Sequence, residues 1–450
     1  MDLKFIRENP QAIKDAVRMK RVALDVDELL RADGELLELK KKSQSLNEEK
    51  NANAKKMKGA SPEEREAIIA RGREVGGEIE SLKPASEQAE KRLQELLYLV
   101  PMVPSPDAPV GPDESGNVEV KKWGKKPEFS FKARDHVDLI NHQNWADLER
   151  IAKVAGSRSY ALKGDLVLLE MSIIRFGLDK LASKGFELIS VPAMAREFAF
   201  IGTGHFPTGR EQVYYLPDDD IYLAGTAEVP VNALHSGEML NEEQLPIRYG
   251  GVSPCFRREA GSAGRDVRGL IRVHQFNKVE QYILCKNDPA ESNKWHKALL
   301  ETSEELLQDF ELHYRVVEVC TGDMGAGKYK MFDIETWVPS ENLYRETHSC
   351  SNLHDWQARR TNLRYRAVDG TVKFCHTLNN TAVATPRILV PFLEQHQQAD
   401  GTIRIPAKLA PLLGGRTTLG KPRLVRRARK KLLSSADDSS AKTPATTSGA

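Results

Sequence analysis

The chain has 450 residues, and 40% of them are hydrophobic, so it is long and apolar enough for two or three domains with a sizeable core. Its formal net charge of +2 excludes a uniformly basic protein, so any nucleic-acid contact must come from local patches. The five cysteines are far apart and form no Cys-x-x-Cys pair, which argues against a disulfide framework or a thiolate zinc site and favours a reducing cytosol.

The N-terminal sequence MDLKFIRENP lacks the apolar run of a signal peptide, and no later run has membrane-spanning length, so we expect a soluble cytoplasmic protein without a membrane partner. Residues 1–100 have a helical pattern instead. Between Leu29 and Leu46, apolar residues recur at alternating spacings of three and four, which is typical of a coiled coil. The pattern stops at Gly59 and restarts with the capping box Ser61–Glu64. It predicts two long antiparallel helices that project as an arm, with a kink at Pro84.

Residues 101–122 contain PMVPSPDAPVGPDESG and predict a stiff proline- and glycine-rich linker. From residue 123 to 414, helical and strand-like runs interleave without regular β-α-β spacing, which favours an α+β domain with a mainly antiparallel sheet flanked by helices. The expected helices are 166–183, 289–310 and 387–397, and the expected strands include 213–216, 221–223, 314–320 and 331–338. Residues 415–450, with a basic cluster at 423–431, predict a disordered tail.

The most informative stretch is FRREAGSAGRDVRGLIRVHQFNKVE, at residues 256–280. Two strand-like runs flank a glycine-containing loop with the cations Arg265, Arg268 and Arg272. Arginine forks bind phosphate or carboxylate oxygens in pairs, and Phe276 offers a flat face to a base. A hairpin with a solvated basic loop would satisfy the same pattern.

The order of residues in this stretch resembles the second signature of class II aminoacyl-tRNA synthetases, in the form found in seryl-tRNA synthetases. Further segments are similar to the same family: Gly156–Arg158 resembles the entry to its catalytic domain, and 184–192 its dimer-forming first signature. The third signature corresponds to 376–387, where the usual Asn-Gly-Ser-Gly is replaced by Asn-Asn-Thr-Ala. The resemblance covers about residues 1–414, including the arm.

The resemblance implies a serine–tRNA ligase that forms seryl-adenylate from L-serine and ATP and then charges tRNA(Ser), with tRNA(Sec) as a further expected substrate. It implies that the arm binds tRNA, that the chain forms a homodimer, and that Mg²⁺ accompanies ATP while zinc does not. The implied serine contacts are Thr226, Ala227, Glu228, Arg257, Glu280 and Thr381. The implied ATP contacts are Arg257, Arg258, Glu259, Val273, Phe276, Glu346, Thr347, His348, Ser349 and Arg387. Arg257, Glu259 and Arg387 are the implied catalytic residues, and Glu346 and Ser349 the implied Mg²⁺ ligands.

Two alternatives remain open from the sequence. The first is an amino acid–carrier protein ligase on the same catalytic core, although such relatives lack the long arm and bind zinc through cysteine in the pocket. The second is a non-catalytic coiled-coil protein, RNA-binding or regulatory, derived from a synthetase. The presence of Arg257, Glu259, Glu280, Glu346 and Arg387 argues against the second alternative.

Overall fold

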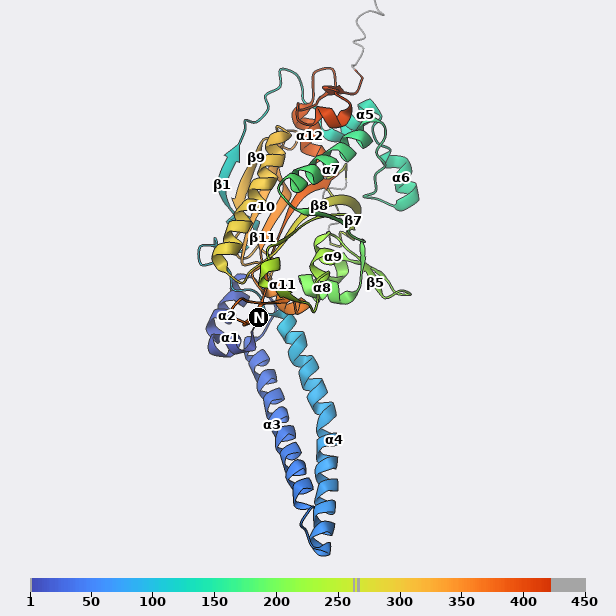
Figure 1. Cartoon of the computed structure of the whole chain (residues 1–450). Coiled ribbons are helices and arrows are strands. Elements are labelled where there is room, and N and C mark those ends of the chain that lie inside the picture. Colours follow the sequence, from blue (N-terminus) through green and yellow to red (C-terminus); the bar gives the residue numbers. More distant parts are fainter. Residues whose placement is uncertain (1, 262–263, 265–267, 422–450) are drawn as a thin grey trace, which may run out of the picture.

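The structure of the chain is a computed structural model that describes residues 2–261, 264 and 268–421. Figure 1 shows a long helical hairpin next to the N-terminus and a body formed by the rest of the described chain. This confirms the expected fold class, an antiparallel helical arm followed by an α+β domain with a mainly antiparallel sheet. Arg265 and the basic cluster at 423–431 lie outside the described residues.

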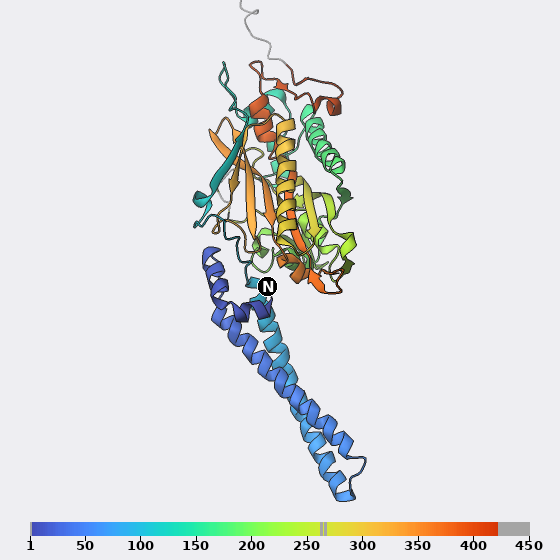
Figure 2. The same ribbon diagram turned by 60° about the vertical axis from the view of Figure 1, so that its left-hand side comes forward.

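The arm consists of α3 (Val26–Lys56) and α4 (Pro62–Leu99), which project away from the body (Figure 2). α4 begins with the predicted capping box, in which Ser61 and Glu64 each accept a hydrogen bond from the other's backbone N–H. Leucines and alanines from both helices form the seam that holds the hairpin together. α4 continues through Pro84, so the proline does not divide it into two helices.

Buried contacts join the base of the arm to the body. The short helices α1 (Leu3–Glu8) and α2 (Pro10–Met19) pack against the start of α3. The buried ammonium group of Lys20 then donates to three backbone carbonyls of the body. The indole N–H of Trp356 donates to the carbonyl of Val100, just beyond α4, over 2.9 Å. The arm is therefore fixed to the body by specific hydrogen bonds.

The segment expected to be a linker is also attached to the body. The backbone N–H of Met102 donates to Ala326 O over 2.9 Å, and Met102 is buried. Strand β1 (Val118–Trp123) pairs antiparallel with β9 (Tyr314–Glu318) and forms one edge of the main sheet. The expected linker end at residue 122 is thus corrected, because the sheet begins at Val118. The side chains of β1 are mostly exposed, so the strand lacks the half-buried alternation that identifies strands in a sequence.

The body is organised around an eight-stranded sheet in the order β1-β9-β10-β11-β14-β8-β7-β2. All neighbours are antiparallel except β2 and β7, which are parallel. The other strands of this sheet are β2 (Glu187–Ser190), β7 (Ile247–Phe256), β8 (Gln275–Cys285), β10 (Lys330–Val338), β11 (Leu343–Asn352) and β14 (His376–Thr385).

Helices α7 (Asp165–Ser183) and α10 (Pro289–Asp309) pack on one face of the sheet (Figure 1). Side chains alternate along β8, so Val279 and Ile283 join that helical core, whereas Glu280 points to the opposite face. The remaining helices are α5 (His136–Gln143), α6 (Leu148–Ala155), α8 (Glu197–Thr203), α9 (Glu228–Ala233), α11 (Trp356–Thr361) and α12 (Leu389–His396). The shorter strands are β3 (Met194–Ala195), β4 (Tyr214–Leu216), β5 (Ile221–Leu223), β6 (Met239–Asn241), β12 (Arg364–Arg366), β13 (Val372–Phe374), β15 (Ile403–Arg404) and β16 (Thr418–Leu419).

The body extends beyond residue 414, where the sequence placed the start of the tail. Leu419 of β16 is buried, and β16 pairs antiparallel with β15. Asp165, at the start of α7, accepts hydrogen bonds from the Arg416 guanidinium and the Gly420 backbone. Residues 415–421 are therefore part of the body, and this corrects the expected boundary. Among the helices of the described residues, none is long and apolar enough to cross a lipid bilayer.

Candidate active site

The main pocket lies over β8, next to the end of its partner strand β7. Their register sets Gly251 opposite Glu280 and Cys255 opposite Phe276, so the residues that follow β7 face those that begin β8. The pocket lies on the sheet face opposite α7 and α10, and β11 and β14 complete it. Its lining residues are Arg257, Glu259, Leu270, Ile271, Val273, Phe276, Lys278, Glu346, Thr347, Thr381, Ala384, Thr385, Pro386 and Arg387.

Arg257 and Phe276 lie together at the centre of this pocket. The guanidinium carbon is 5.1 Å from the centre of the Phe276 ring, within the range of a cation–π contact. Arg257 Nε also donates to Gly225 O over 3.4 Å, where the glycine lets the backbone come close: an added Cβ would lie 3.2 Å from Arg257 Cγ. Glu259 accepts from Arg272 over 2.9 Å and reaches the pocket from a backbone with φ of 53°. The arrangement combines cations with an open aromatic face.

Beside the pocket, Thr226, Glu228 and Glu280 form a buried acidic cluster, called here the acidic chamber, which meets the pocket lining at Lys278. The Thr226 hydroxyl donates to Glu280 Oε2 over 3.1 Å and accepts from the Glu228 N–H over 3.2 Å. The ammonium of Lys278 contacts both Glu280 and the Thr226 hydroxyl. Burial raises the pKa of Glu280, and the charge of Lys278 only partly offsets this effect. Thr381 stands directly opposite Glu280 in the β14–β8 ladder.

A network of amides holds Glu228. Its Oε1 accepts from Gln357 Nε2 over 2.7 Å and from Asn379 Nδ2 over 2.8 Å. Gln357 Oε1 in turn accepts from the hydroxyls of Tyr282 and Thr377, and all of these residues are buried. Burial alone would raise the pKa of Glu228, but nearby cations and the Gln357 amide outweigh it, and the pKa lies below its usual value. The carboxylate is therefore held in its charged form at neutral pH.

Arg387 also lines the pocket. Its Nε donates to Ile271 O over 3.1 Å, and its Nη1 donates to Glu346 O over 3.3 Å. Burial lowers the pKa of the guanidinium, which nevertheless stays cationic at neutral pH. Two backbone carbonyls thus fix the direction of this side chain. A second hollow, which Glu346 and Arg387 also line, lies beside it.

Three of the expected ATP contacts, Arg258, His348 and Ser349, do not line the main pocket. His348 is buried, its Nδ1 contacts the Thr347 hydroxyl over 2.9 Å, and its Nε2 contacts Ala382 O over 3.2 Å. Burial lowers the pKa of His348 to about 4, so it is a neutral residue that connects β11 to β14. Arg258 is exposed, and its backbone N–H donates to Gln212 O over 2.9 Å. Neither residue is part of the pocket lining that includes Arg257 and Phe276, and their expected contact with ATP stays a prediction.

Acidic groups on β10 and β11 lie beside Arg387. Glu346, Glu335 and Asp333 line the hollow, and the Ser349 hydroxyl makes a hydrogen bond with Asp333. Asp333 Oδ1 is buried and has no hydrogen-bond partner within the described part of the chain. Burial and the negative charge of Glu346 raise the pKa of Asp333 well above its usual value. In the described ranges no three His, Cys, Asp or Glu side chains are grouped to hold a metal ion by themselves.

The sequence analysis missed Lys278, Asp333, Gln357 and Asn379. Lys278 precedes Glu280 by two residues on a strand, so the strand period of two would have placed both on one face. Asp333 and Glu335 have the same spacing on β10. Gln357 reaches Glu228 across 129 positions of the chain, a contact for which the sequence contains no local signal.

Comparisons with known proteins agree over nearly the whole chain. The family model for the seryl-tRNA synthetase N-terminal domain matches residues 1–104, and the model for the tRNA synthetase class II core domain (G, H, P, S and T) matches residues 214–396. The serine–tRNA ligase of Deinococcus radiodurans is 55% identical over 94% of this chain and 99% of its own length. The crystal structure of the Pyrococcus horikoshii seryl-tRNA synthetase complexed with ATP is 39% identical, with a TM-score of 0.87 over 94% of this chain and 99% of that one. The Naegleria fowleri cytoplasmic serine–tRNA ligase in complex with AMP is 28% identical, with a TM-score of 0.83 over 93% and 98%.

Proposed function

This chain belongs to the seryl-tRNA synthetase family, and from this premise we propose how its residues share the two steps of serine–tRNA ligation. In the first step, a carboxylate oxygen of L-serine attacks the α-phosphorus of ATP, and pyrophosphate leaves. In the second, a hydroxyl of the terminal tRNA ribose attacks the acyl carbon, and AMP leaves. The observation that carries the assignment is the buried acidic chamber, which contacts Lys278 of the pocket that Arg257 and Phe276 also line.

The acidic chamber binds serine. The Glu228 carboxylate and the Thr226 hydroxyl receive the substrate ammonium, which needs anionic and neutral oxygen acceptors in a dry site. Glu280 and Thr381 pair with the substrate hydroxyl from opposite strands, β8 and β14, and Ala227 closes the chamber wall. Alanine is rejected because these buried polar groups would remain unpaired in its complex.

The centre of the pocket binds ATP. Phe276 stacks on the adenine ring while Glu259 and the Val273 backbone read its edge. Arg257 bridges the serine carboxylate and the α-phosphate, the two groups that must meet, and Arg387 holds the outer phosphates. No protein nucleophile or general base is needed, because positioning and charge stabilisation account for the rate.

The hollow beside Arg387 suits the Mg²⁺ that accompanies ATP, with Glu346 and Ser349 as its protein ligands. Magnesium takes few protein oxygens and completes its shell with water and phosphate. The unpartnered Asp333 oxygen supports this placement, because a buried carboxylate with a raised pKa favours a nearby cation. Asp333 also orients the Ser349 hydroxyl toward the same hollow. When bound, Mg²⁺ would neutralise phosphate charge.

The arm binds the tRNA. A rod formed by helices of 31 and 38 residues, with a narrow apolar seam, is suited to contacting RNA by shape and phosphate rather than by base edges. tRNA(Ser) is the expected partner, and tRNA(Sec) is a second candidate that would share its shape.

The chain forms a homodimer through the edge of the sheet near β2. Leu188 on the edge strand β2 exposes 43% of its surface, and Leu168 and Met171 on α7, a helix that contacts β2, expose 51% and 47%. Exposed apolar residues beside an unpaired strand favour association with a second copy.

Serine-dependent ATP–pyrophosphate exchange tests the proposal. The chain should exchange label with L-serine but not with alanine, and Arg257→Ala should lower the rate by about 10²–10³ because a charge-stabilising donor is lost. Arg150→Ala, whose side chain is 83% exposed on α6, is the surface control and should behave as the unchanged protein. Exchange that does not depend on serine, or near-normal exchange by Arg257→Ala, would contradict the assignment.

A further inference from the structure

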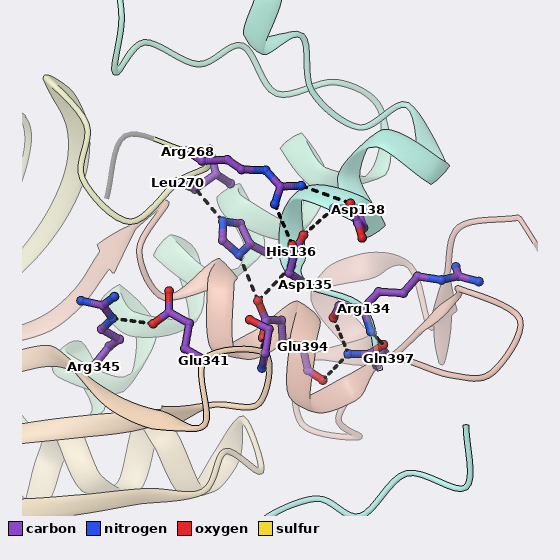
Figure 3. Close-up of polar contacts among 11 residues, drawn as sticks. Arg134, Asp135, His136, Asp138, Arg268, Leu270, Glu341, Arg345, Glu394 and Gln397 are labelled. Atoms are coloured by element: carbon purple, nitrogen blue, oxygen red, sulfur yellow. Dashed lines mark hydrogen bonds and ion pairs between the residues drawn. The ribbon is translucent and has the colours of Figure 1, made fainter. Parts of the chain in front are cut away.

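Glu394 on α12 is a buried carboxylate that contacts His136 on α5 (Figure 3). Its Oε1 accepts from the His136 backbone N–H over 2.9 Å and contacts His136 Nδ1 over 3.0 Å. Its Oε2 accepts from the Ser340 N–H over 2.9 Å. Three donors satisfy the charged carboxylate, which therefore acts as a fixed anchor for the His136 ring.

The proton of His136 can be assigned from its neighbours. On its other side, Nε2 lies 3.4 Å from the backbone N of Leu270 (Figure 3). A backbone N–H can only donate, so Nε2 accepts and Nδ1 carries the proton that it donates to Glu394. The ring thus connects a buried carboxylate on α12 to the backbone of the basic loop between β7 and β8.

The end of this loop is held tightly against α5. Gly269 has φ of +87°, and a Cβ built there would lie 2.1 Å from His136 Nε2 and 2.9 Å from Val137 Cγ2. Arg268 adds ion pairs to Asp135 over 3.0 Å and to Asp138 over 3.2 Å (Figure 3). These pairs are largely exposed and contribute little on their own. The position of the backbone at the end of the loop is therefore determined by two contacts, the close approach of Gly269 to α5 and the contact with the His136 ring.

The position of the backbone at Leu270 and Ile271 determines the orientation of the Arg387 side chain. Leu270 and Ile271 line the ATP pocket, and Ile271 O is the acceptor for Arg387 Nε over 3.1 Å. A shift of the backbone at Leu270 would move that carbonyl and turn the guanidinium away from the phosphates. The contacts form one continuous series from Glu394 through His136 and the loop backbone to Arg387.

We propose that His136 is a positioning residue for adenylate formation, which acts through the backbone of residues 270–271 on the phosphate-binding Arg387. The proposal rests on the ATP site described above. His136 lies outside the lining of the main pocket, and its replacement should weaken ATP binding without changing serine recognition. Glu228 and Glu280 are held by Gln357 and Thr226 and do not depend on His136.

Two substitutions of His136 distinguish the contact made by Nδ1 from the contact made by Nε2. His136→Asn keeps an amide nitrogen near the Nδ1 position and can still donate to Glu394, but it lacks an acceptor for Leu270. His136→Gln extends to the Nε2 position and can accept from the Leu270 N–H. We expect His136→Asn to raise the KM for ATP in pyrophosphate exchange by up to about tenfold, the effect of one lost hydrogen bond. His136→Gln should remain within about threefold of the unchanged protein, and the KM for serine at saturating ATP should be unchanged in both.

Controls distinguish positioning from general destabilisation. His142→Asn changes an exposed histidine on the same helix and should leave both KM values and the thermal unfolding midpoint unchanged. In an Arg387→Ala background, His136→Asn should have little further effect on ATP binding measured by calorimetry, because its target is already gone. Equal losses in His136→Asn and His136→Gln, parallel changes in both KM values, or full additivity with Arg387→Ala would overturn the proposal. Loss of serine-dependent exchange in the unchanged protein would instead contradict the proposed function.

Discussion

Lys278 places an ammonium group inside the chamber proposed to receive the ammonium of serine. It contacts Glu280 and the Thr226 hydroxyl, while Glu228 is held by the amides of Gln357 and Asn379. Two carboxylates in one dry chamber would repel each other and favour protonation of one of them. Lys328 and Lys278 both lower the pKa of Glu228, whereas burial raises the pKa of Glu280 and Lys278 opposes that rise. Lys278 therefore favours the charged form of Glu280.

Replacing Lys278 should make serine binding more sensitive to acid. Burial already raises the pKa of Glu280, and Lys278 lowers it, so Lys278→Met should move the pKa of Glu280 further up. Because Glu280 loses its charge as pH falls through that pKa, the KM for serine should begin to rise at a higher pH in the variant. A pH series of serine KM in pyrophosphate exchange measures this, with Lys278→Arg as the control that keeps the charge. Identical pH profiles for Lys278→Met and the unchanged protein would show that Lys278 has another role.

At the scale of elements, the six-residue helix α11 contacts two distant parts of the molecule. Trp356 donates to Val100 at the base of the arm, and the next residue, Gln357, donates to Glu228 in the serine chamber. The chain reverses around this helix so that one face supports the arm and another supports the substrate site. A substitution at Trp356 therefore tests the contact with the arm, whereas a substitution at Gln357 tests the contact with Glu228.

Gln357→Met keeps the volume of the side chain but removes both of its polar atoms. Glu228 loses a donor, so its pKa should rise and its carboxylate should be less firmly held. We expect the KM for serine to rise about tenfold or more, as for a lost hydrogen bond to a charged group, while the KM for ATP changes less than twofold. Trp356→Phe, which removes the bond to Val100 and part of the ring on which Arg360 stacks but leaves Gln357 unchanged, is the matched control and should keep the KM for serine. Equal changes in the ATP and serine constants would indicate a purely structural glutamine.

The C-terminal boundary gives a stability test at the same scale. A chain that stops at residue 415 loses the buried Leu419, the β15–β16 pair and the Arg416–Asp165 ion pair. Burial of a leucine side chain alone is worth about 2 kcal/mol, so the thermal unfolding midpoint should fall by several degrees. A chain that stops at residue 421 keeps all of these contacts and should melt as the full chain does. If both truncations melt alike, β16 does not contribute to the body.

The sequence predicted those elements whose own side chains carry a periodic pattern. The expected helix 166–183 is α7 within one residue, and 289–310 is α10 within one residue, because each has an apolar face on the sheet. β1 and β16 were missed because one is exposed and the other is two residues long. In the site, Arg257, Glu280 and Arg387 were placed by resemblance to a signature. Gln357 and Asp333 required the fold, since their partners are distant in the chain.

At the scale of the whole molecule, contacts at the base of the arm fix its orientation relative to the body. Lys20 donates to carbonyls of the body on one side of its base, and Arg360 stacks on Trp356 and contacts the Tyr98 carbonyl on the other. Burial and the positive charge of Lys328 lower the pKa of Lys20 well below its usual value, and three backbone carbonyls hold its amino group in place. Contacts on both sides limit rotation of the arm, so a tRNA bound to it would meet the pocket in a restricted set of orientations.

Shortening the arm should separate the two steps of the reaction. Lys40 and Glu90 face each other across the hairpin at 3.2 Å, so residues 43–87 can be replaced by a short glycine-containing turn. The apolar base that includes Leu29, Leu36 and Leu93 is then retained, and α1 and α2 keep their packing partners. The pocket lies in the body, so serine-dependent pyrophosphate exchange should stay within about twofold of the full chain.

Transfer of serine to tRNA by this shortened chain should fall by at least about a hundredfold, because most of the rod that we propose to contact the RNA by shape and phosphate is gone. The measurement is aminoacylation of tRNA(Ser) at fixed salt, with exchange followed on the same preparation. As a control, Arg71→Ala within the full-length arm removes the ion pairs to Glu49, Glu74 and Glu78 and leaves the helices in place. Because these pairs are largely exposed, its effect on unfolding should be small. Efficient charging by the shortened chain would show that the hairpin serves a different partner.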